Sequence, residues 1–270
     1  MKKVILITGA SSGFGLATAN ALAAQGYIVY GASRSVKNLK DISFKPLEMD
    51  VTDDASVNAG VAKIIKEEGR IDVLINNAGI TFAGAGYDMS VEFAKKQFEV
   101  NFFGVIRVSS AVLPGMIENK QGLVINVSSM AGLFGLPYQS TYVAAKFALE
   151  GYSESLRMEL QNTGVNVTVI NPGDFKTNNT STREKAPLTL AHDYLKKEYE
   201  ASIAVQEKNE IQGGDPAVVA AQIVSIVAKS KPAHRYLVGD FGQTKLPLMV
   251  KALLPSAVFS KQINGYYNIK

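Results

Sequence analysis

The sequence predicts an α/β fold, a doubly wound parallel sheet of about seven strands with helices on both faces. Apolar runs such as Val4–Ile7 are continuous rather than alternating, as expected of strands buried on both faces. These runs alternate with helical patterns along the chain, which is typical of βαβ units. Because 47% of the 270 residues are hydrophobic, we expect one domain, residues 1–270, with a substantial core.

The first strand, Val4–Ile7, runs directly into a glycine-rich turn and then into a helical stretch, Leu16–Gln25. Glycines let backbone amides approach a pyrophosphate closely, and the N-terminus of the following helix favours negative charge. We therefore predict that this turn holds the phosphates of a dinucleotide; a simple tight turn is the alternative. Its candidate cofactor-binding residues are Gly9, Ser11, Ser12, Gly13, Phe14 and Gly15.

The second strand, Tyr27–Gly31, leads into Ser33 and Arg34. In NAD sites an acidic residue about 20 positions beyond the glycines binds the ribose 2′-hydroxyl, but the first acid here is Asp41. An arginine suits a 2′-phosphate, which a carboxylate would repel. We expect NADP(H) to be preferred over NAD(H), with Arg34 and either Ser12 or Ser33 at the phosphate. An exposed loop arginine is the alternative.

Further strands and helices follow in alternation. We expect strands at Lys45–Met49, Asp72–Ile75, Leu123–Val127, Val165–Ile170 and Tyr236–Val238, and helices at Asp54–Glu68, Val91–Met116, Ala191–Gln206 and Asp215–Lys229. Four of the strands end in polar turns: Asp50-Val51, Asn76–Gly79, Ser128-Ser129 and Asn171–Gly173. Because ligands bind beyond the carboxyl ends of such strands, these turns are candidates for a site.

Tyr142 and Lys146 lie four positions apart in an Ala- and Leu-rich helical stretch, Tyr142–Glu150, so they share one helix face. The pKa of a free phenol is near ~10, and a fixed positive charge nearby lowers it. Such a tyrosine can exchange protons near neutral pH. The pair alone is weak evidence, because this spacing is common on ordinary amphipathic helices.

Together, the glycine turn, Asn76–Gly79 and the Tyr142/Lys146 pair resemble the short-chain dehydrogenase/reductase family over essentially the whole chain. Ser129 lies thirteen residues before Tyr142, as in that family. The stretch from Ser129 to Gly151 particularly resembles the 17β-hydroxysteroid and retinol dehydrogenase branch. The resemblance implies a Rossmann-type oxidoreductase that transfers a hydride between a nicotinamide cofactor and a carbonyl or alcohol.

The resemblance further implies a catalytic set of Asn101, Ser129, Tyr142 and Lys146. Tyr142 would donate a proton to the carbonyl oxygen, and Ser129 would hydrogen-bond the same oxygen. Lys146 would lower the pKa of Tyr142 and bind the nicotinamide ribose, while Asn101 would hold a water that links Lys146 to solvent. Ser128 competes for the serine role, but the spacing favours Ser129.

The same resemblance assigns further cofactor contacts. Asp50 and Val51 would flank the adenine, Asn77, Ala78 and Gly79 would abut the adenosine side, and Pro172, Gly173 and Thr177 would contact the nicotinamide end. The family pattern has an aliphatic residue where Phe175 stands. This departure puts the backbone path between Pro172 and Thr177 in doubt.

The substrate side is expected in residues 174–214, which in the family cover the cleft, and a tail follows over residues 243–270. Met130, Leu136 and Phe175 are candidates for an apolar wall, although each could equally be core. Such a wall suits a lipophilic ketone or alcohol, and the resemblance implies a steroid-like, retinoid or other lipophilic carbonyl. The tail could close the cleft, pack on a partner or touch a membrane surface, and Pro247 and Pro255 argue against a span.

Composition excludes several other classes. Without cysteine, disulfides and thiolate metal sites are impossible, and two distant histidines, His192 and His234, argue against any metal. The net charge of +4 is spread along the chain, so we expect no nucleic-acid partner. No apolar run approaches the ~20 residues of a membrane span. We expect a cytoplasmic homodimer or homotetramer, since relatives usually oligomerise.

Two alternative functions belong to other classes of protein. A non-catalytic dinucleotide-binding sensor or scaffold should show a broken catalytic set, but all four positions are filled. A sugar-nucleotide epimerase shares the tyrosine–lysine pair. Against it stand the Thr-Gly-x-x-x-Gly-x-Gly spacing and the lack of a large C-terminal substrate domain within these 270 residues.

Overall fold

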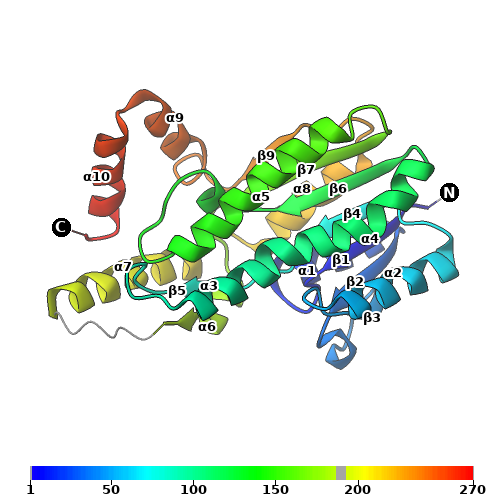
Figure 1. Cartoon of the computed structure of the whole chain (residues 1–270), viewed down its shortest axis with the longest axis horizontal. Helices are drawn as coiled ribbons and strands as arrows, with labels where there is room; N and C mark the ends of the chain where they lie inside the picture. Colours follow the sequence, from blue (N-terminus) through cyan, green and yellow to red (C-terminus); the bar gives the residue numbers. More distant parts are fainter. Residues whose placement is uncertain (1, 187–192, 270) are drawn as a thin grey trace.

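A computed structural model describes residues 2–186 and 193–269 and confirms the predicted fold class. One parallel sheet forms the centre (Figure 1), with strands in the order β3-β2-β1-β4-β6-β7-β9. Its strands are β1 (Val4–Thr8), β2 (Ile28–Ser33), β3 (Lys45–Glu48), β4 (Val73–Asn76), β6 (Gly122–Val127), β7 (Val165–Pro172) and β9 (Arg235–Val238). The strand order reverses at β1, which lies between β2 and β4, and ligands bind at such a switch point.

Helices cover both faces of the sheet because the strand side chains alternate between two apolar cores. In β1, Val4 and Leu6 belong to one core, whereas Ile5 and Ile7 belong to the other. The first core contains side chains of α2 (Asp54–Glu68), α4 (Gly104–Glu118) and α5 (Ser140–Glu159). The second contains side chains of α1 (Gly13–Ala24) and α8 (Pro216–Ala228).

The helix expected at Val91–Met116 is interrupted. It consists of α3 (Val91–Phe98), a π-helical segment η2 (Glu99–Phe103) and α4. A π turn inserts extra backbone into a helix and is frequent at functional sites. Asn101 lies in this segment, so the interruption falls on a predicted catalytic residue.

The combined helix Val91–Glu118 has the length and apolar composition of a membrane span, by those two criteria alone. Within its most apolar window, 44% is buried inside the protein. Val108, Val112 and Met116 on α4 belong to the core beside the sheet. These inward residues account for part of the apolar composition.

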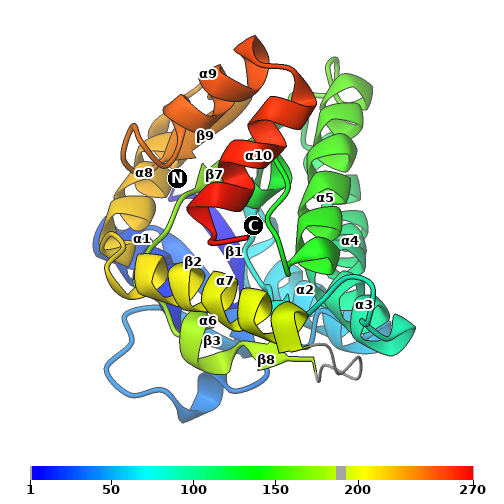
Figure 2. The same cartoon turned by 90° about the vertical axis from the view of Figure 1, so that its left-hand side faces the viewer.

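Two helices of the second half of the chain lie across the carboxyl ends of the strands. Figure 2 looks onto this end, with α7 (Asp193–Ile211, yellow) and α10 (Ser256–Tyr266, red) in front of the sheet. The start of the helix expected over Ala191–Gln206 lies outside the described residues, and α7 is described from Asp193 to Ile211. The tail is helical, with α9 (Lys245–Leu253) before α10.

Short elements complete the chain. The structure also contains β5 (Phe82–Ala83) and β8 (Glu184–Lys185), which pair in parallel, α6 (Asn179–Thr182), and the 3-10 turns η1 (Val36–Asn38) and η3 (Met130–Gly132). The β5–β8 pair joins residues about 100 positions apart and ties the lid region to the segment after β4. Local sequence patterns do not reveal such a short long-range pair.

Candidate active site

A cavity of about 290 Å³ lies at the switch point of the sheet. The turns after β1, β2, β3 and β4 form its walls, together with η2 and α5. Fifteen of the predicted cofactor residues line it: Gly9, Ser11, Ser12, Gly13, Phe14, Ser33, Arg34, Asp50, Val51, Asn77, Ala78, Gly79, Tyr142, Lys146 and Thr177. Turns that follow successive parallel strands around one cavity are typical of a dinucleotide site.

The glycines of the first turn are required by its backbone. Gly9 and Gly13 have φ angles of +69° and +52°, which other residues rarely adopt. A Cβ on Gly15 would lie 2.2 Å from the carbonyl oxygen of Gly9, so this predicted cofactor residue lies behind the cavity wall and permits the tight turn. The Thr8 hydroxyl accepts hydrogen bonds from the backbone amides of Asn77 and Ala78, each at 3.0 Å, and joins the ends of β1 and β4.

The adenosine end of the cavity combines a buried hydroxyl with two charges. The Ser33 Oγ is buried and has no hydrogen-bond partner among the described residues, and Arg34 is exposed beside it. Burial raises the pKa of Asp50, but hydrogen bonds from Thr52 and the charge of Arg34 hold it below its usual value. An unsatisfied hydroxyl beside a guanidinium fits a phosphorylated ribose, so these residues are compatible with the predicted cofactor.

Lys146 is buried on α5, with its Nζ donating a hydrogen bond to the carbonyl oxygen of Val127 at 2.9 Å. The same Nζ lies 5.8 Å from the centroid of the Tyr142 ring. Burial lowers the pKa of Lys146 to about 8, although the nearby charge of Glu150 raises it. This ammonium can therefore release and take up protons close to neutral pH.

The pKa of Tyr142 moves in the direction opposite to the one expected from the sequence. Burial raises it, and the hydrogen-bonded hydroxyl of Ser129 lowers it in part. The expected effect of Lys146 does not dominate because that ammonium faces the Val127 carbonyl and is itself desolvated. A phenol with a raised pKa keeps its proton at neutral pH, which suits a proton donor.

Ser129 follows β6 and is held in place by neighbours. Its Oγ accepts a hydrogen bond from the backbone amide of Ala131 at 3.1 Å, and its carbonyl oxygen accepts one from Asn171 at 2.9 Å. The same Asn171 amide donates to Glu150 at 2.6 Å. The structure therefore brings Ser129, not Ser128, against the Tyr142 phenol. Ser128 has a buried Oγ without a partner among the described residues.

Asn101 also lines the cavity, and both ends of its amide bind Ile80. Its Oδ1 accepts from the Ile80 backbone amide at 2.8 Å, and its Nδ2 donates to the Ile80 carbonyl oxygen at 2.9 Å. The π-helical segment turns this side chain inward. Asn101, Tyr142 and Lys146 of the predicted catalytic set line this cavity, and Ser129 lines a second cavity that Tyr142 also borders.

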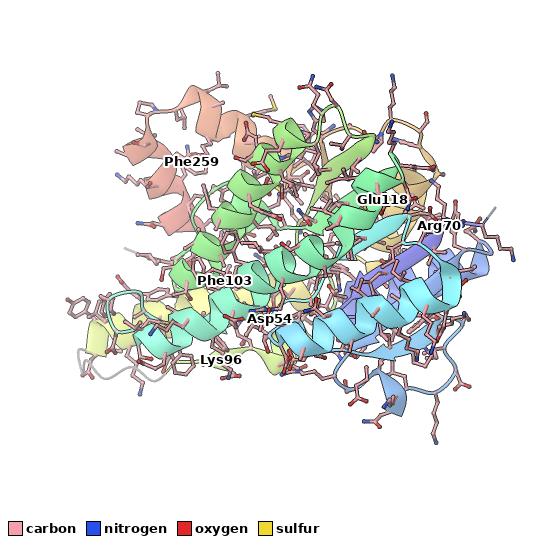
Figure 3. All side chains as sticks on the ribbon, turned by 45° about the vertical axis from the view of Figure 1, so that its right-hand side comes forward. Asp54, Arg70, Lys96, Phe103, Glu118 and Phe259 are labelled. Carbon is pink, nitrogen blue, oxygen red and sulfur yellow. The ribbon has the colours of Figure 1, made fainter. Side chains whose placement is uncertain are left out.

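A second cavity, of about 100 Å³, opens on the other side of Tyr142. The predicted residues Leu136, Phe175, Pro172 and Gly173 line it. The substrate candidate Met130 does not, because it is buried in an apolar cluster with Phe134 and Phe259. Phe259 extends from α10 (Figure 3), so the tail packs on this side of its own chain.

The second cavity is more polar than the apolar substrate site expected from the sequence. Its lining includes side chains that no sequence motif indicated: Gln139, Asp174, Arg183, Gln206, Glu210 and Tyr267. Charged residues inside the expected lid, 174–214, were the only available signal for three of them. Closure of the cleft by the tail was one of three alternatives, and Tyr267 lines the cavity because the tail folds back. His192 lies outside the described residues.

The departure at Phe175 has a structural explanation. Its ring is buried and meets Phe14 edge-on, with centroids 5.5 Å apart. The backbone beside it pairs with Gly214, and the amide of Lys176 donates to the Gly214 carbonyl oxygen at 2.9 Å. A side chain on Gly214 would meet the Phe175 ring at 2.7 Å, so the large ring and the small residue accommodate each other.

The fold and the site define a class of protein, an oxidoreductase that binds a nicotinamide dinucleotide. The comparison with known families agrees: the sequence pattern of short chain dehydrogenases matches residues 3–187. The chain belongs to the short-chain dehydrogenase/reductase family, as its motifs predicted.

Similar proteins cover nearly the whole chain. A 3-ketodihydrosphingosine reductase of Bacteroides thetaiotaomicron is 41% identical over 99% of each chain. The mouse dehydrogenase/reductase SDR family member 7B is 31% identical over 95% of this chain and 79% of that protein. The solved structure of a short-chain dehydrogenase from Streptomyces avermitilis is 34% identical, with a TM-score of 0.77, and covers 88% of this chain and 89% of that one.

Both nicotinamide dinucleotides occur among similar structures. A Burkholderia phymatum family member in complex with NAD is 25% identical, with a TM-score of 0.75, over 87% of this chain and 88% of that one. A serine dehydrogenase in complex with NADP+ is 26% identical, with a TM-score of 0.75, over 89% and 96%. The choice between the two cofactors therefore depends on this chain's own residues.

Proposed function

We propose that this chain is an NADP(H)-dependent ketone reductase, and that its substrate is a long-chain 3-keto amino alcohol of the 3-ketodihydrosphingosine type. The carrying observation is the position of Tyr142, which lines both the dinucleotide cavity and the second cavity. A carbonyl bound from the second cavity can meet the phenol, the Ser129 hydroxyl and the cofactor at one point.

The chain's own residues would act as follows. When bound, the reduced nicotinamide supplies a hydride to the carbonyl carbon. Ser129 and Tyr142 hydrogen-bond the carbonyl oxygen, and Tyr142 passes its proton to that oxygen as negative charge develops there. Lys146, with a pKa of about 8, can return a proton toward the site. Asn101 is fixed by Ile80 close to this path.

Three properties of this chain support the substrate class. The relative at 41% identity is a 3-ketodihydrosphingosine reductase, and the similarity covers 99% of both chains. Leu136 and Phe175 give the second cavity apolar walls that suit an alkyl chain. The charged side chains in the same cavity suit a polar group beside the ketone.

The main test is NADPH-dependent turnover of 3-ketodihydrosphingosine beside a panel of other lipophilic ketones, including steroids and retinoids. We expect 3-ketodihydrosphingosine to have the highest kcat/KM of the panel. The Tyr142→Phe variant should lose activity by about 100-fold or more because it lacks the proton donor, while its NADPH affinity stays close to that of the wild type. Near-full turnover by this variant would contradict the mechanism.

Cofactor choice can be tested through Arg34. We expect Arg34→Asp to lower the ratio of kcat/KM for NADPH to that for NADH by about 10- to 100-fold, because the guanidinium is replaced by a charge that repels the 2′-phosphate. Lys40→Asp makes the same charge change at an exposed position outside the cavity and should leave the ratio unchanged. An unchanged NADPH preference in Arg34→Asp would reject the assignment.

A non-catalytic sensor is the second candidate. It is favoured only by the high polarity of the second cavity, which could hold a regulatory ligand. NADPH binding without turnover of any ketone in the panel would support it over the reductase.

A further inference from the structure

The second cavity contains a charged group of three side chains, Asp174, Arg183 and Glu210, next to Tyr142. We propose that Asp174 and Arg183 form a recognition site for an amino alcohol adjacent to the ketone, with Asp174 accepting the ammonium and Arg183 donating to the hydroxyl oxygen. This inference rests on the proposed function and names the residues that would select its substrate.

Arg183 has a buried guanidinium that is only partly hydrogen-bonded. Its side chain is fully buried, and one terminal nitrogen, Nη2, pairs with Glu210. The other two nitrogens, Nε and Nη1, are buried without a hydrogen-bond partner among the described residues. Buried donors are almost always satisfied by protein, water or ligand. Because Arg183 lines the cavity, these donors are available to an acceptor on a bound molecule.

Asp174 places a carboxylate at the same cavity. Its carboxylate lines the same cavity, and no hydrogen bond or ion pair from the described residues reaches it, although its backbone amide contacts Gln243. Burial and the charge of Glu210 raise its pKa to about 6, whereas Arg183 lowers it. Asp174 lines the same cavity as Tyr142 and Tyr267, and its charge raises the pKa of both phenols.

The two carboxylates and one guanidinium of this group carry one more negative charge than positive charge. Arg183 balances Glu210, which also accepts a hydrogen bond from Thr180 at 2.5 Å. The remaining carboxylate, Asp174, is therefore free to balance one cation. An ammonium is a compact donor that needs acceptors, whereas an uncharged hydroxyl oxygen can accept from the buried guanidinium.

A 3-keto amino alcohol presents these groups in one short stretch. The ammonium is on the carbon beside the carbonyl, and the hydroxyl is on the next carbon. With the carbonyl oxygen at Tyr142 and Ser129, the ammonium falls within reach of a carboxylate beside that phenol. The alkyl chain leaves on the other side of the carbonyl, where apolar walls such as Leu136 are required.

The test compares two ketones that differ in one group. A water-soluble short-chain 3-keto amino alcohol is assayed beside the same molecule with a hydroxyl in place of the amino group, with NADPH. For Asp174→Asn we expect kcat/KM to fall about tenfold or more on the amino ketone, because the ion pair is lost. The fall on the neutral ketone should be under about threefold, and its turnover shows that the variant is folded.

Binding supplies a readout that does not depend on chemistry. Calorimetric titration of the amino-alcohol product should show about tenfold weaker binding to Asp174→Asn than to the wild type. Glu200→Gln is the matched control, because it removes a carboxylate from an exposed position on α7, where Glu200 lies near Lys196. This control should leave both substrates and the binding unchanged.

The outcomes separate this subsite from the substrate assignment. Equal losses on both ketones in Asp174→Asn would overturn the subsite and leave the proposed reductase in place. If the wild type turned over the neutral ketone but not the amino ketone, both the subsite and the proposed substrate would be overturned. A preference for an analogue with a carboxylate in place of the amino group would also overturn the proposal, in favour of an anion held by Arg183.

Discussion

Lys146 shows how burial changes the chemistry of a residue. It is 5% exposed, and within the described part of the chain its ammonium has one acceptor, the Val127 carbonyl oxygen. Burial therefore lowers its pKa from an ordinary 10.5 to about 8. The residue is thereby suited to proton exchange, but the protein is less stable for burying its charge.

This burial predicts a pH dependence of stability. Below about pH 8 the lysine is protonated in both states, and the cost of burying its charge is fully present. Between about pH 8 and 10.5 the unfolded state binds more protons, so the free energy of unfolding rises with pH. Relative to Lys146→Met, the wild type should gain up to about 3 kcal/mol across this window.

The measurement is chemical denaturation of both proteins, without cofactor, from pH 7 to 10.5. Taking the difference between them removes the contribution of the other titrating groups. A difference that stays constant across the window, or falls, would show that the ammonium is solvated in the folded protein.

At the scale of elements, α10 closes the substrate side of the protein. Phe259 on this helix is 7% exposed and meets Phe134 edge-on, with ring centroids 6.0 Å apart. Tyr267, just beyond the helix, lines the second cavity. The tail therefore packs on its own chain. It lines the second cavity together with the lid, residues 174–214.

We expect Phe259→Ala to loosen this helix, because replacing a buried phenylalanine costs about 3–5 kcal/mol in a packed core. The KM for the ketone should rise about tenfold while the KM for NADPH stays within about twofold, since the cofactor cavity is elsewhere. Limited proteolysis should cut the tail faster. Val258→Ala truncates an exposed neighbouring side chain and should change none of these values. If the KM for the ketone rose equally in both variants, the rise would not be due to the packing of Phe259.

At the scale of the whole molecule, the order of the strands brings distant turns together. β1 pairs with both β2 and β4, so the glycine turn, Arg34 and Asn77 meet although they are far apart along the chain. Helices on both faces leave the carboxyl edge of the sheet as the place for a ligand. Both cavities lie at this edge.

The oligomeric state stays a prediction at this scale. We expect light scattering to give a mass of two or four times the 29.0 kDa chain, because a homodimer or homotetramer is usual in the family. A single mass of 29.0 kDa over a wide concentration range would reject it. The cytoplasmic location is likewise a proposal, which cell fractionation can test.

The sequence by itself determined the fold class, the glycine turn and the positions of Ser129, Tyr142 and Lys146. These features are encoded locally: strand burial appears as apolar runs, positive φ angles appear as glycines, and one helical turn appears as a spacing of four. The helix at Asp54–Glu68 has the predicted bounds because Asp53 caps its start and Gly69, with φ +80°, ends it.

Only the tertiary structure decided the π turn at Asn101, the directions of the pKa changes at Tyr142 and Lys146, and the charged lining of the substrate cavity. Each of these depends on groups that are distant in sequence. Ile80 holds Asn101, the Val127 carbonyl oxygen holds Lys146, and Tyr267 reaches Asp174 only after the tail has folded back. Desolvation and pairing arise from packing, which no local pattern records.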